Sequence, residues 1–409
     1  MNILMVNKFL WPKGGAETYL IRLGENLKTM GHRVDYFGMD SPERTVGNRM
    51  DAYTGYMDFH SGSPWEKLGY SLRVIYSGDA RRKIRRVLEA FQPDVCHLNN
   101  FNYQLTPSIL LEIRNWQRET GHSCKILYTA HDYQLVCPNH LCYDPGREVP
   151  CEKCLDGNYL HCIRCRCIHG SRLRSVLGAA EGFFWRAMGT YRQIDTVICC
   201  SRFLKDRLDR NPALAGKTVV LHNFAETVPD MPQKKGDYIL YFGRYEPEKG
   251  VADLLQAAKD LPDIFFRFAG SGSLKGAMEE ISNVQDLGYL SGEDLRKLIR
   301  QARLTVCPSR WYENCPMSVL ESLSLGTPVL GAGIGGIPEL ILPGVTGYLF
   351  ESGNVAALTE KLSALWNDRG LIETMAENCR KTFFDTPRTY AEKFLVLAGE
   401  EEAHENHPD

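Results

Sequence analysis

The chain has 409 residues, a formal net charge of −2 at pH 7 and 14 cysteines. This length exceeds what one ordinary hydrophobic core supports and fits two domains, and the small net charge argues against a strongly basic nucleic-acid-binding protein. No run of 18 apolar residues occurs, and the chain opens on a strand-like segment at 2–7 instead of a signal peptide. We therefore expect a cytoplasmic protein with reduced cysteines.

The first 223 residues follow the pattern of a doubly wound parallel sheet. After the strand at 2–7 comes a glycine-rich turn and then a helix whose apolar side chains recur with the helical period: Ala16, Leu20, Leu23, Leu27 and Met30. Gly31 suits the left-handed end of this helix, and the next strand at 32–37 completes a βαβ unit. Further apolar runs alternate with helical stretches, at 94–98, 125–129 and 196–200. We predict a Rossmann-like N-terminal domain over residues 1–223.

A second domain of the same type follows a linker. Residues 224–236 carry two prolines and little apolar periodicity, which is typical of an interdomain linker. The α/β pattern then restarts with a strand at 238–242, a helix at 251–261 and a strand at 264–269, and it continues to residue 350. We predict a Rossmann-like C-terminal domain over 237–386. The last segment, 387–409, contains a helix at about 389–402, and its periodicity does not show on which domain it packs.

Glycines after the first strand form the first candidate ligand site. In open parallel sheets, ligands bind beyond the carboxyl ends of the strands, so two facing sheets place the site between the domains. Gly14 and Gly15 follow the first strand and open its helix, where free backbone N–H groups and the helix dipole favour a phosphate. A plain tight turn is an equally good interpretation of two glycines alone.

A second candidate phosphate site follows the first strand of the C-terminal domain. Gly243 and Arg244 end this strand, and Lys249 precedes the next helix. A guanidinium can donate to two oxygens of a diphosphate while an ammonium acts as a point charge, so the two cations suit that ligand. The alternative is a pair of solvated charges with Glu246 and Glu248 as neighbours.

Two acidic residues flank the start of a later helix. Pro316 suits the first turn of that helix and Gly326 its end, so Glu313 lies just before the helix and Glu321 within it. Carboxylates in these places can accept hydrogen bonds from sugar hydroxyls. Alternatively, Glu313 complements the helix dipole and Glu321 lies on a solvated or ion-paired helix face.

Glu313 and Glu321, with seven residues between them, resemble the E-x7-E motif of the retaining glycosyltransferases of family 4. The resemblance spans nearly the whole chain, because other segments are similar to motifs of this family in the same order: Gly14-Gly15-Ala16-Glu17, Gly243-Arg244, Lys249-Gly250 and Gly335-Gly336-Ile337-Pro338-Glu339. It implies the GT-B fold, in which two Rossmann-like domains face each other across a cleft and the last helix crosses back to the N-terminal domain.

The resemblance also implies roles for individual residues. Arg244 and Lys249 bind the diphosphate of a nucleotide-sugar donor. Glu321 binds the ribose and Glu313 the transferred sugar. Backbone groups that bind substrate come from the glycine loops and from the segment after Glu313, namely Gly14, Gly15, Gly243, Asn314, Pro316, Met317 and Ser318. His131, which follows the strand at 125–129, is the implied active-site histidine near the anomeric carbon, although a lone histidine is otherwise more often structural.

The implied reaction is sugar transfer with retention of anomeric configuration. The two cations and the helix dipole stabilise the leaving diphosphate, so no cofactor or metal is expected for catalysis. We assign no carboxylate nucleophile, because no second acid can be placed across the bond. The resemblance favours a uridine or guanosine diphosphate sugar as donor, a glycan or lipid-linked acceptor and a cell-surface glycan as product.

Half of the cysteines lie within residues 137–167: Cys137, Cys142, Cys151, Cys154, Cys162, Cys165 and Cys167. The pairs Cys151/Cys154 and Cys162/Cys165 have the C-x2-C spacing of zinc knuckles. The resemblance to a family subgroup with a cysteine-rich insert after a His-Asp-Tyr motif selects a different set: Cys137, Cys151, Cys154 and Cys167. We expect a structural zinc in this insert, with free thiols, disulfides or an iron–sulfur cluster as alternatives. The insert begins six residues after His131, so it is predicted to shape the acceptor pocket.

Two basic stretches suit an anionic membrane surface. They lie at 81–86 and 164–174, and the second is followed by the aromatic residues 183–185. The first stretch also fits the solvated face of a helix whose core side chains are Ile84, Val87, Leu88 and Phe91. The aromatic residues also fit the interior of the N-terminal domain.

Two other functions compete with glycosyl transfer. An epimerase of the same fold breaks a nucleotide-sugar bond without an acceptor, and the E-x7-E pattern argues against it. A non-catalytic, metal-stapled protein of a polysaccharide assembly complex is disfavoured by the set formed by His131, Arg244, Lys249, Glu313 and Glu321.

Overall fold

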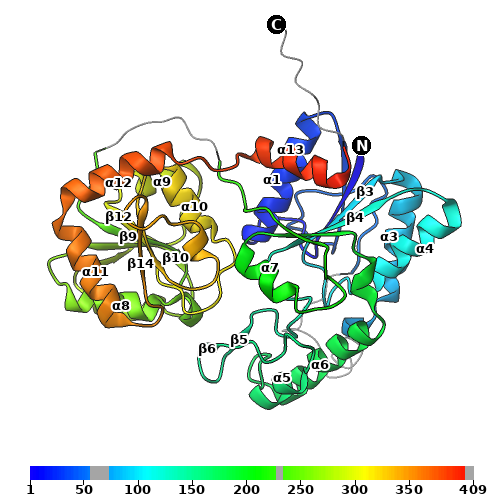
Figure 1. Cartoon of the computed structure of the whole chain (residues 1–409), viewed down its shortest axis with the longest axis horizontal. Coiled ribbons are helices and arrows are strands. Elements are labelled where there is room, and N and C mark those ends of the chain that lie inside the picture. The colour runs from blue at the N-terminus through cyan, green and yellow to red at the C-terminus, as the bar shows by residue number, and fades with distance from the viewer. Residues whose placement is uncertain (56–72, 227–233, 401–409) are drawn as a thin grey trace, which may run out of the picture.

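The computed structural model describes residues 1–55, 73–226 and 234–400, which form two α/β domains lying side by side (Figure 1). Each domain contains a six-stranded sheet in which all neighbouring strands are parallel. Within these ranges no helix has the length and apolar character needed to cross a membrane. Residues 227–233 of the predicted linker and 401–409 of the predicted tail lie outside the described residues.

The N-terminal sheet has the strand order β2-β1-β3-β4-β7-β8. The elements of this domain are β1 (Asn2–Val6), α1 (Gly15–Thr29), β2 (Arg33–Phe37), α3 (Gly78–Phe91), β3 (Val95–Leu98), α4 (Ser108–Thr120), β4 (Lys125–Ala130), β5 (Tyr143–Asp144), β6 (Val149–Pro150), α5 (Leu160–Cys165), α6 (Arg172–Ala187), η1 (Thr190–Gln193), β7 (Thr196–Cys199), α7 (Arg202–Leu208) and β8 (Thr218–Val220). Central strands are largely apolar, as in β1 from Ile3 to Val6, because helices cover both faces of a parallel sheet. Gly31 has a φ of 92°, the left-handed conformation predicted for the end of α1.

The C-terminal sheet has the order β11-β10-β9-β12-β13-β14. Its elements are β9 (Ile239–Arg244), η2 (Pro247–Lys249), α8 (Val251–Asp260), β10 (Phe266–Ser271), η3 (Lys275–Met278), β11 (Val284–Asp286), α9 (Gly292–Gln301), β12 (Leu304–Cys307), α10 (Met317–Ser324), β13 (Val329–Ala332), η4 (Ile337–Glu339), β14 (Gly347–Phe350), α11 (Val355–Asn367) and α12 (Arg369–Lys381). The candidate site segments follow β9 and β12, two neighbouring strands, so the carboxyl ends of these strands bring them to one edge of the sheet.

The last helix, α13 (Pro387–Ala398), crosses back to the N-terminal domain and packs on α1, as the family resemblance implies (Figure 1). Tyr390 and Phe394 of α13 are fully buried there, and the hydroxyl of Tyr390 lies 2.8 Å from that of Tyr19. Each large side chain buried in this way stabilises the contact by about 1.5 to 3 kcal/mol. The same cluster contains Phe224, whose ring stacks on Tyr19 at 5.5 Å. The segment around Phe224 and helix α13 both follow the N-terminal sheet in sequence, and both contribute side chains to the core of the N-terminal domain.

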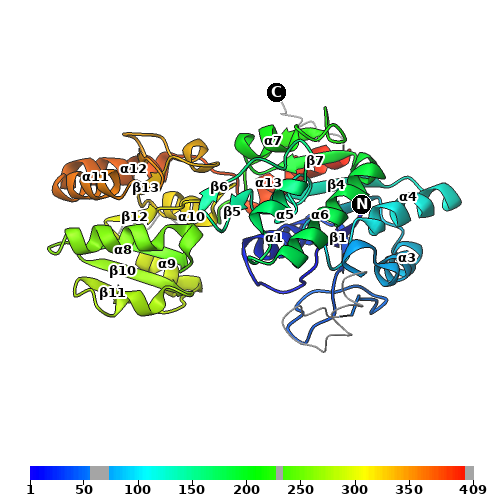
Figure 2. The same ribbon diagram turned by 90° about the horizontal axis from the view of Figure 1, so that it is seen from below.

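The cysteine-rich insert contributes the hairpin β5–β6 and α5, which together with α6 form a subdomain at one end of the N-terminal domain (Figure 1). Figure 2 shows the hairpin on the side of the insert that lies toward the C-terminal domain. Helices α5 and α6 pack closely because α6 has glycines on its inner face. A Cβ at Gly178 would lie 2.4 Å from Ile168, and one at Gly182 would lie 2.9 Å from the ring of Tyr159.

Candidate functional site

Lys249 and Glu313 form an ion pair on the C-terminal domain. The Nζ atom of Lys249 lies 2.6 Å from Oε1 of Glu313, and it sits 4.6 Å from the centre of the Trp311 ring. The guanidinium of Arg244 lies 5.9 Å from the same ring and pairs with Glu248 at 3.2 Å. The structure therefore brings Arg244, Lys249 and Glu313 around one indole, and it also shows the acidic neighbour that the sequence offered as an alternative partner for Arg244.

Glu313 is a buried carboxylate that keeps its charge. Besides Lys249 it accepts a hydrogen bond from the hydroxyl of Ser309 at 2.8 Å. Burial alone would raise the pKa of Glu313, but the charge of Lys249 and these hydrogen bonds hold it below the usual range. Its backbone carbonyl accepts from the N–H of Gly336 at 2.6 Å, and a Cβ at Gly336 would lie 1.9 Å from the carbonyl oxygen of Asn314. The segment that contains Gly335 and Gly336 thus packs closely against the backbone of Glu313 and Asn314 and fixes its position.

Asn314 connects this acid to His131 on the other domain. Its side-chain amide donates to the backbone carbonyl of His131 at 2.9 Å, and the Nε2 atom of His131 lies 2.9 Å from Oδ1 of Asn99. Burial lowers the pKa of His131 to about 3, so the imidazole is neutral at physiological pH. The two residues meet across 183 positions of sequence, which places the predicted histidine and the predicted sugar-binding acid at a single interdomain junction.

The N-termini of α1 and α10 also meet at this junction. A Cβ at Gly15 would lie 3.6 Å from the side chain of Met317, the first residue of α10. Neither helix has a side-chain hydrogen bond at its N-cap, which is Gly14 in α1 and Pro316 in α10. Free N–H groups and two positive dipole ends therefore adjoin the Lys249–Glu313 pair, an arrangement that favours an anionic group. Ser318 lies in the first turn of α10.

Glu321 has a different environment from Glu313. It lies one turn into α10 and is half-buried, and burial raises its pKa to about 7, with Glu226 acting in the same direction and Arg296 against it. Glu226 itself pairs with Arg22 of α1 at 3.1 Å and approaches Arg296 of α9 at 3.9 Å. Glu321 thus neighbours a charged cluster between the domains and has no direct contact with the Lys249–Glu313 pair.

Three residues that the sequence reasoning did not assign also take part in the junction. The side chain of Asn99 is hydrogen-bonded to the ring of His131, and the ring of Trp311 makes cation–π contacts with Arg244 and Lys249. The carboxylate of Glu339 accepts from the N–H groups of Arg202 and Phe203 at 2.8 and 2.7 Å, at the N-terminus of α7 in the other domain. Asn99 directly follows β3, so the rule that ligands bind beyond strand ends would have selected it.

The predicted zinc site is not supported. Within the described ranges, which include every cysteine, no group of three or more His, Cys, Asp or Glu side chains is arranged to hold a metal ion. The pair Cys162/Cys165 lies on α5 and so does not form the turn of a zinc knuckle. Cys154 and Cys162 are buried in an apolar cluster with Tyr159, while Cys165 lines a pocket with Asp144.

Burial sets the pKa of most thiols in the insert. Burial raises the pKa of Cys142, Cys151 and Cys154, and contact with Cys162 together with burial raises that of Cys167. Cys137 is the exception, because contact with Cys142 lowers its pKa. None of the 14 cysteines, all of which are described, forms a disulfide.

The two basic stretches have different environments. In α3 the side chains of Ile84, Val87, Leu88 and Phe91 are buried, and Arg81 and Arg85 pair with Glu112 of α4, so the first stretch is the outer face of a packed helix. After the second stretch, Trp185 is fully buried, while Phe183 and Phe184 are exposed on α6.

Comparison with known proteins places the chain in a family. Residues 13–228, more than half of the chain, match the model described as Glycosyltransferase Family 4, and residues 226–382 match Glycosyl transferases group 1. An uncharacterised glycosyltransferase of Methanocaldococcus jannaschii is 30% identical over 52% of this chain and 60% of its own length. An uncharacterised 42.6 kDa protein of the cps region of Klebsiella pneumoniae is 23% identical over 84% of this chain and 89% of its own length.

The solved structures give the same fold. HepE of Anabaena, in a complex with UDP, superposes with a TM-score of 0.67 at 17% identity and covers 98% of this chain and 100% of that one. The two facing Rossmann-like domains with a returning C-terminal helix are the GT-B architecture. From the matched models and this architecture, the chain belongs to glycosyltransferase family 4.

Proposed function

We propose that the protein transfers a sugar from a nucleotide-diphosphate sugar to an acceptor with retention of anomeric configuration. The observation that carries the proposal is the interdomain junction, where the Lys249–Glu313 pair adjoins the Asn314–His131 bridge and two helix N-termini. Cations and free N–H groups there suit a diphosphate, and the neighbouring polar groups suit a sugar. Family membership argues against the epimerase and the non-catalytic alternatives.

Each group has a role that its environment supports. Arg244, Lys249 and the N-terminus of α10 stabilise the negative charge that develops on the leaving diphosphate. Glu313, which is held as an anion, accepts hydrogen bonds from hydroxyls of the transferred sugar. His131 is neutral and serves as a hydrogen-bonding group whose backbone carbonyl faces the same junction. Glu321 accepts from the ribose in its carboxylate form. None of these roles uses a metal or a cofactor.

The donor and acceptor classes follow from this assignment and from the relatives. We propose a uridine diphosphate sugar as donor, since a protein of the same fold was solved with UDP. We propose a glycan or lipid-linked acceptor and a polysaccharide or glycolipid product, because a relative is described from a cps region. The free thiols fit a reducing cytoplasmic location.

The helix α6 supplies a surface for peripheral contact with an anionic membrane. Its inner face is small or buried, whereas its outer face exposes large apolar side chains, which are Leu173, Val176, Phe183, Phe184 and Met188. Four exposed arginines at or near its N-terminus have no ion-pair partner in the described ranges, and they are Arg164, Arg166, Arg172 and Arg174. An interfacial helix inserts apolar side chains into the membrane–water interface, and its neighbouring cations contact acidic lipid headgroups. The residues on and near α6 have both features.

The membrane contact can be measured by cosedimentation with vesicles of phosphatidylcholine and phosphatidylglycerol. Leu173 is 80% exposed, so Leu173→Glu should leave folding intact and weaken vesicle binding by about tenfold or more, given about 1.5 to 3 kcal/mol for one buried leucine. Phe383→Glu is the matched control, because Phe383 is 76% exposed after α12, away from α6. If the two variants bind vesicles equally, or if both fail to pellet with them, α6 does not make a specific membrane contact. Its apolar face then serves a protein partner, or the vesicle binding is nonspecific adhesion.

The transferase assignment is tested by thermal unfolding with a panel of nucleotide-diphosphate sugars. A donor at 100 times its dissociation constant should add about 2.7 kcal/mol to stability, and Arg244→Gln should reduce this effect. Arg192→Gln is the control, because Arg192 is exposed, has no ion pair among the described residues and lies on the N-terminal domain. The anomeric configuration of the product, read by NMR, tests retention. Stabilisation by no nucleotide sugar, or by all variants equally, contradicts the proposal.

A further inference from the structure

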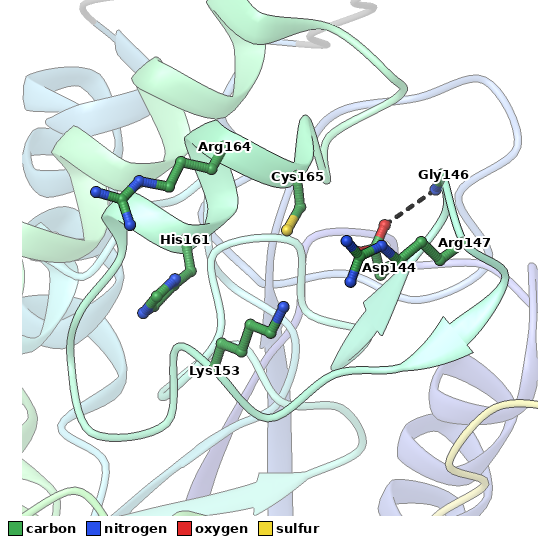
Figure 3. Close-up of a pocket in the computed structure, with 7 residues that line it drawn as sticks. All are labelled: Asp144, Gly146, Arg147, Lys153, His161, Arg164 and Cys165. Atoms are coloured by element: carbon green, nitrogen blue, oxygen red, sulfur yellow. Dashed lines mark hydrogen bonds between the residues drawn. The ribbon is translucent and has the colours of Figure 1, made fainter.

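The cysteine-rich insert contains a pocket whose lining residues are distinct from those of the interdomain junction. This pocket has a volume of about 530 Å³ and lies between the hairpin β5–β6, the turn at 151–156 and α5 (Figure 3). The cations Arg147, Lys153 and Arg164 line it together with His161 and a single acid, Asp144. Figure 3 shows the head groups of Arg147 and Lys153 directed into the space between the hairpin and α5, with Arg164 extending from α5 at the rim.

Positive charge exceeds negative charge in the lining of this pocket. Arg147, Lys153 and Arg164 have no carboxylate partner among residues 1–55, 73–226 and 234–400. Asp144 is buried in the wall, and one of its oxygens already accepts the backbone N–H of Gly146 at 3.1 Å. Cations that share one pocket repel each other unless an anion lies between them, so the charge excess favours a bound anion.

The turn that carries Lys153 is fixed in place by ion pairs on its other side. The turn at 151–156 is held to α7 by Arg207, which pairs with Glu152 at 2.9 Å, and to the segment after α7 by Arg210, which pairs with Asp156 at 2.5 Å. The same turn therefore presents Lys153 to the pocket from a fixed backbone. The acidic residues of this turn, Glu152 and Asp156, thus pair with Arg207 and Arg210 and not with the cations of the pocket.

The size and the remaining acid define the ligand further. A volume of this order accommodates a small organic molecule and exceeds the needs of a lone phosphate. Arg147 and Lys153 bind phosphate oxygens, while Asp144, which also contacts the thiol of Cys165, is the one carboxylate in the lining that can accept a hydroxyl. We propose that the pocket binds a phosphorylated sugar through its phosphate. Because this inference rests on the proposed function, the ligand is assigned to the acceptor side of the transfer reaction.

The location of the hairpin supports the acceptor assignment. Glu148, next to Arg147 in the hairpin, lies 3.9 Å from Arg310 of the C-terminal domain, and Arg310 is three residues before Glu313. Figure 2 shows β5 and β6 between α5 and the C-terminal domain. One wall of the pocket is thus also the part of the insert that contacts the donor-binding segment, so a ligand held here lies beside the reacting domain.

The experiment compares two doubly substituted full-length proteins. Arg147→Gln/Lys153→Gln removes the two cations that point into the pocket. Arg192→Gln/Lys259→Gln removes one arginine and one lysine that are exposed and unpaired in the described ranges, far from the pocket in sequence, so it matches the change in net charge. All four side chains are exposed, and we expect unchanged unfolding temperatures for both variants.

Calorimetric titration with glucose 1-phosphate is the first probe, and vesicles of phosphatidylcholine with and without phosphatidic acid are the second. We expect binding of glucose 1-phosphate that Arg147→Gln/Lys153→Gln weakens at least about tenfold and that the control retains. If only phosphatidic acid vesicles bind, with the same dependence on the pocket, the phosphate is that of a lipid headgroup. Binding of neither probe, or equal loss in both variants, would overturn the pocket assignment.

A nucleotide titration separates this inference from the proposed function. Stabilisation by UDP should persist in Arg147→Gln/Lys153→Gln, because the donor groups lie on the other domain. If UDP stabilises the wild-type protein and both variants, and glucose 1-phosphate binding does not depend on the pocket, the pocket proposal is wrong and the transferase proposal stands. If UDP stabilises none of the three proteins, but glucose 1-phosphate binding depends on the pocket, the donor-site proposal is wrong and the phosphate pocket stands.

Discussion

Breaking the Lys249–Glu313 pair should affect stability and catalysis differently. The pair is close, at 2.6 Å, and the side chains of Lys249 and Glu313 are only 20% and 10% exposed. Removing one partner of a fully buried pair costs about 3 to 5 kcal/mol, so we expect about 2 to 3 kcal/mol for this partly solvated one. Lys249→Met should cost more than Glu313→Gln, because it leaves a buried carboxylate, whereas the flexible ammonium can turn toward water.

The double variant tests whether the pair does more than stabilise the fold. Lys249→Met/Glu313→Gln leaves neither charge unpaired, so unfolding measured with denaturant should show partial recovery of the free energy. Activity should not recover, because each group contacts a different part of the donor. Loss of one charge-assisted hydrogen bond worth about 1.5 to 3 kcal/mol lowers kcat/KM by roughly 10- to 150-fold. If kcat/KM recovers in parallel with stability, the pair is structural and the proposed roles are wrong.

Acid titration gives an independent measure of the same pair. The folded-state pKa of Glu313 is depressed, so its contribution to stability is present above the unfolded-state pKa of about 4.3 and is lost as the pH falls through the folded value. In Lys249→Met this contribution should shrink, and the variant should lose less stability on acidification than the wild-type protein. An identical acid transition in the two proteins would show that Lys249 does not set the charge of Glu313.

Three further outcomes follow from the site and from the insert. Since the pKa of Glu321 is raised to about 7, affinity for a nucleotide diphosphate should increase as the pH rises from 6 to 8, and calorimetry of Glu321→Gln should show weaker binding without this dependence; a persisting slope would exclude Glu321 as its source. In Gly336→Ala the new Cβ would lie 1.9 Å from the carbonyl of Asn314, so kcat/KM should fall at least about tenfold, whereas Gly276→Ala, with open space at that position, should be silent. Burial raises the pKa of Glu181 to about 8, which penalises the folded state increasingly as the pH rises from the unfolded value to 8, so Glu181→Gln should raise the unfolding temperature at pH 8 and have little effect at pH 4.

Most of the fold could be predicted because its signals are local. Apolar runs bounded by glycine and proline identify the strands, and the predicted strand at 125–129 differs from β4 by one residue. The return of α13 could not be read from its own periodicity, since its apolar face fits any complementary surface. Tyr390 shows the reason, because its partner Tyr19 lies 371 positions away and only the fold brings the two together.

The insert shows where spacing alone misleads. A C-x2-C pair predicts a zinc knuckle only if the backbone turns so that both thiols face one point. At Cys162 and Cys165 the chain is helical, and Cys162 is buried against Tyr159 and Cys154 while Cys165 faces the pocket with Asp144. The spacing of Cys162 and Cys165 is that of a knuckle, but the hydrophobic packing of α5 places the two thiols in different surroundings.

Glu313 and Glu321 show what a motif does and does not determine. Their spacing places one acid before a helix and the other one turn inside it, and that much follows from Pro316 and Gly326 alone. Their charge states diverge because of residues elsewhere in the sequence. Lys249, 64 positions earlier, keeps Glu313 ionised, whereas Glu226 adds to the burial that moves Glu321 toward neutrality. An acid with a depressed pKa stays charged throughout the neutral range and can orient a sugar there, while one that titrates near pH 7 makes donor affinity depend on pH, so the two positions of one motif are not interchangeable.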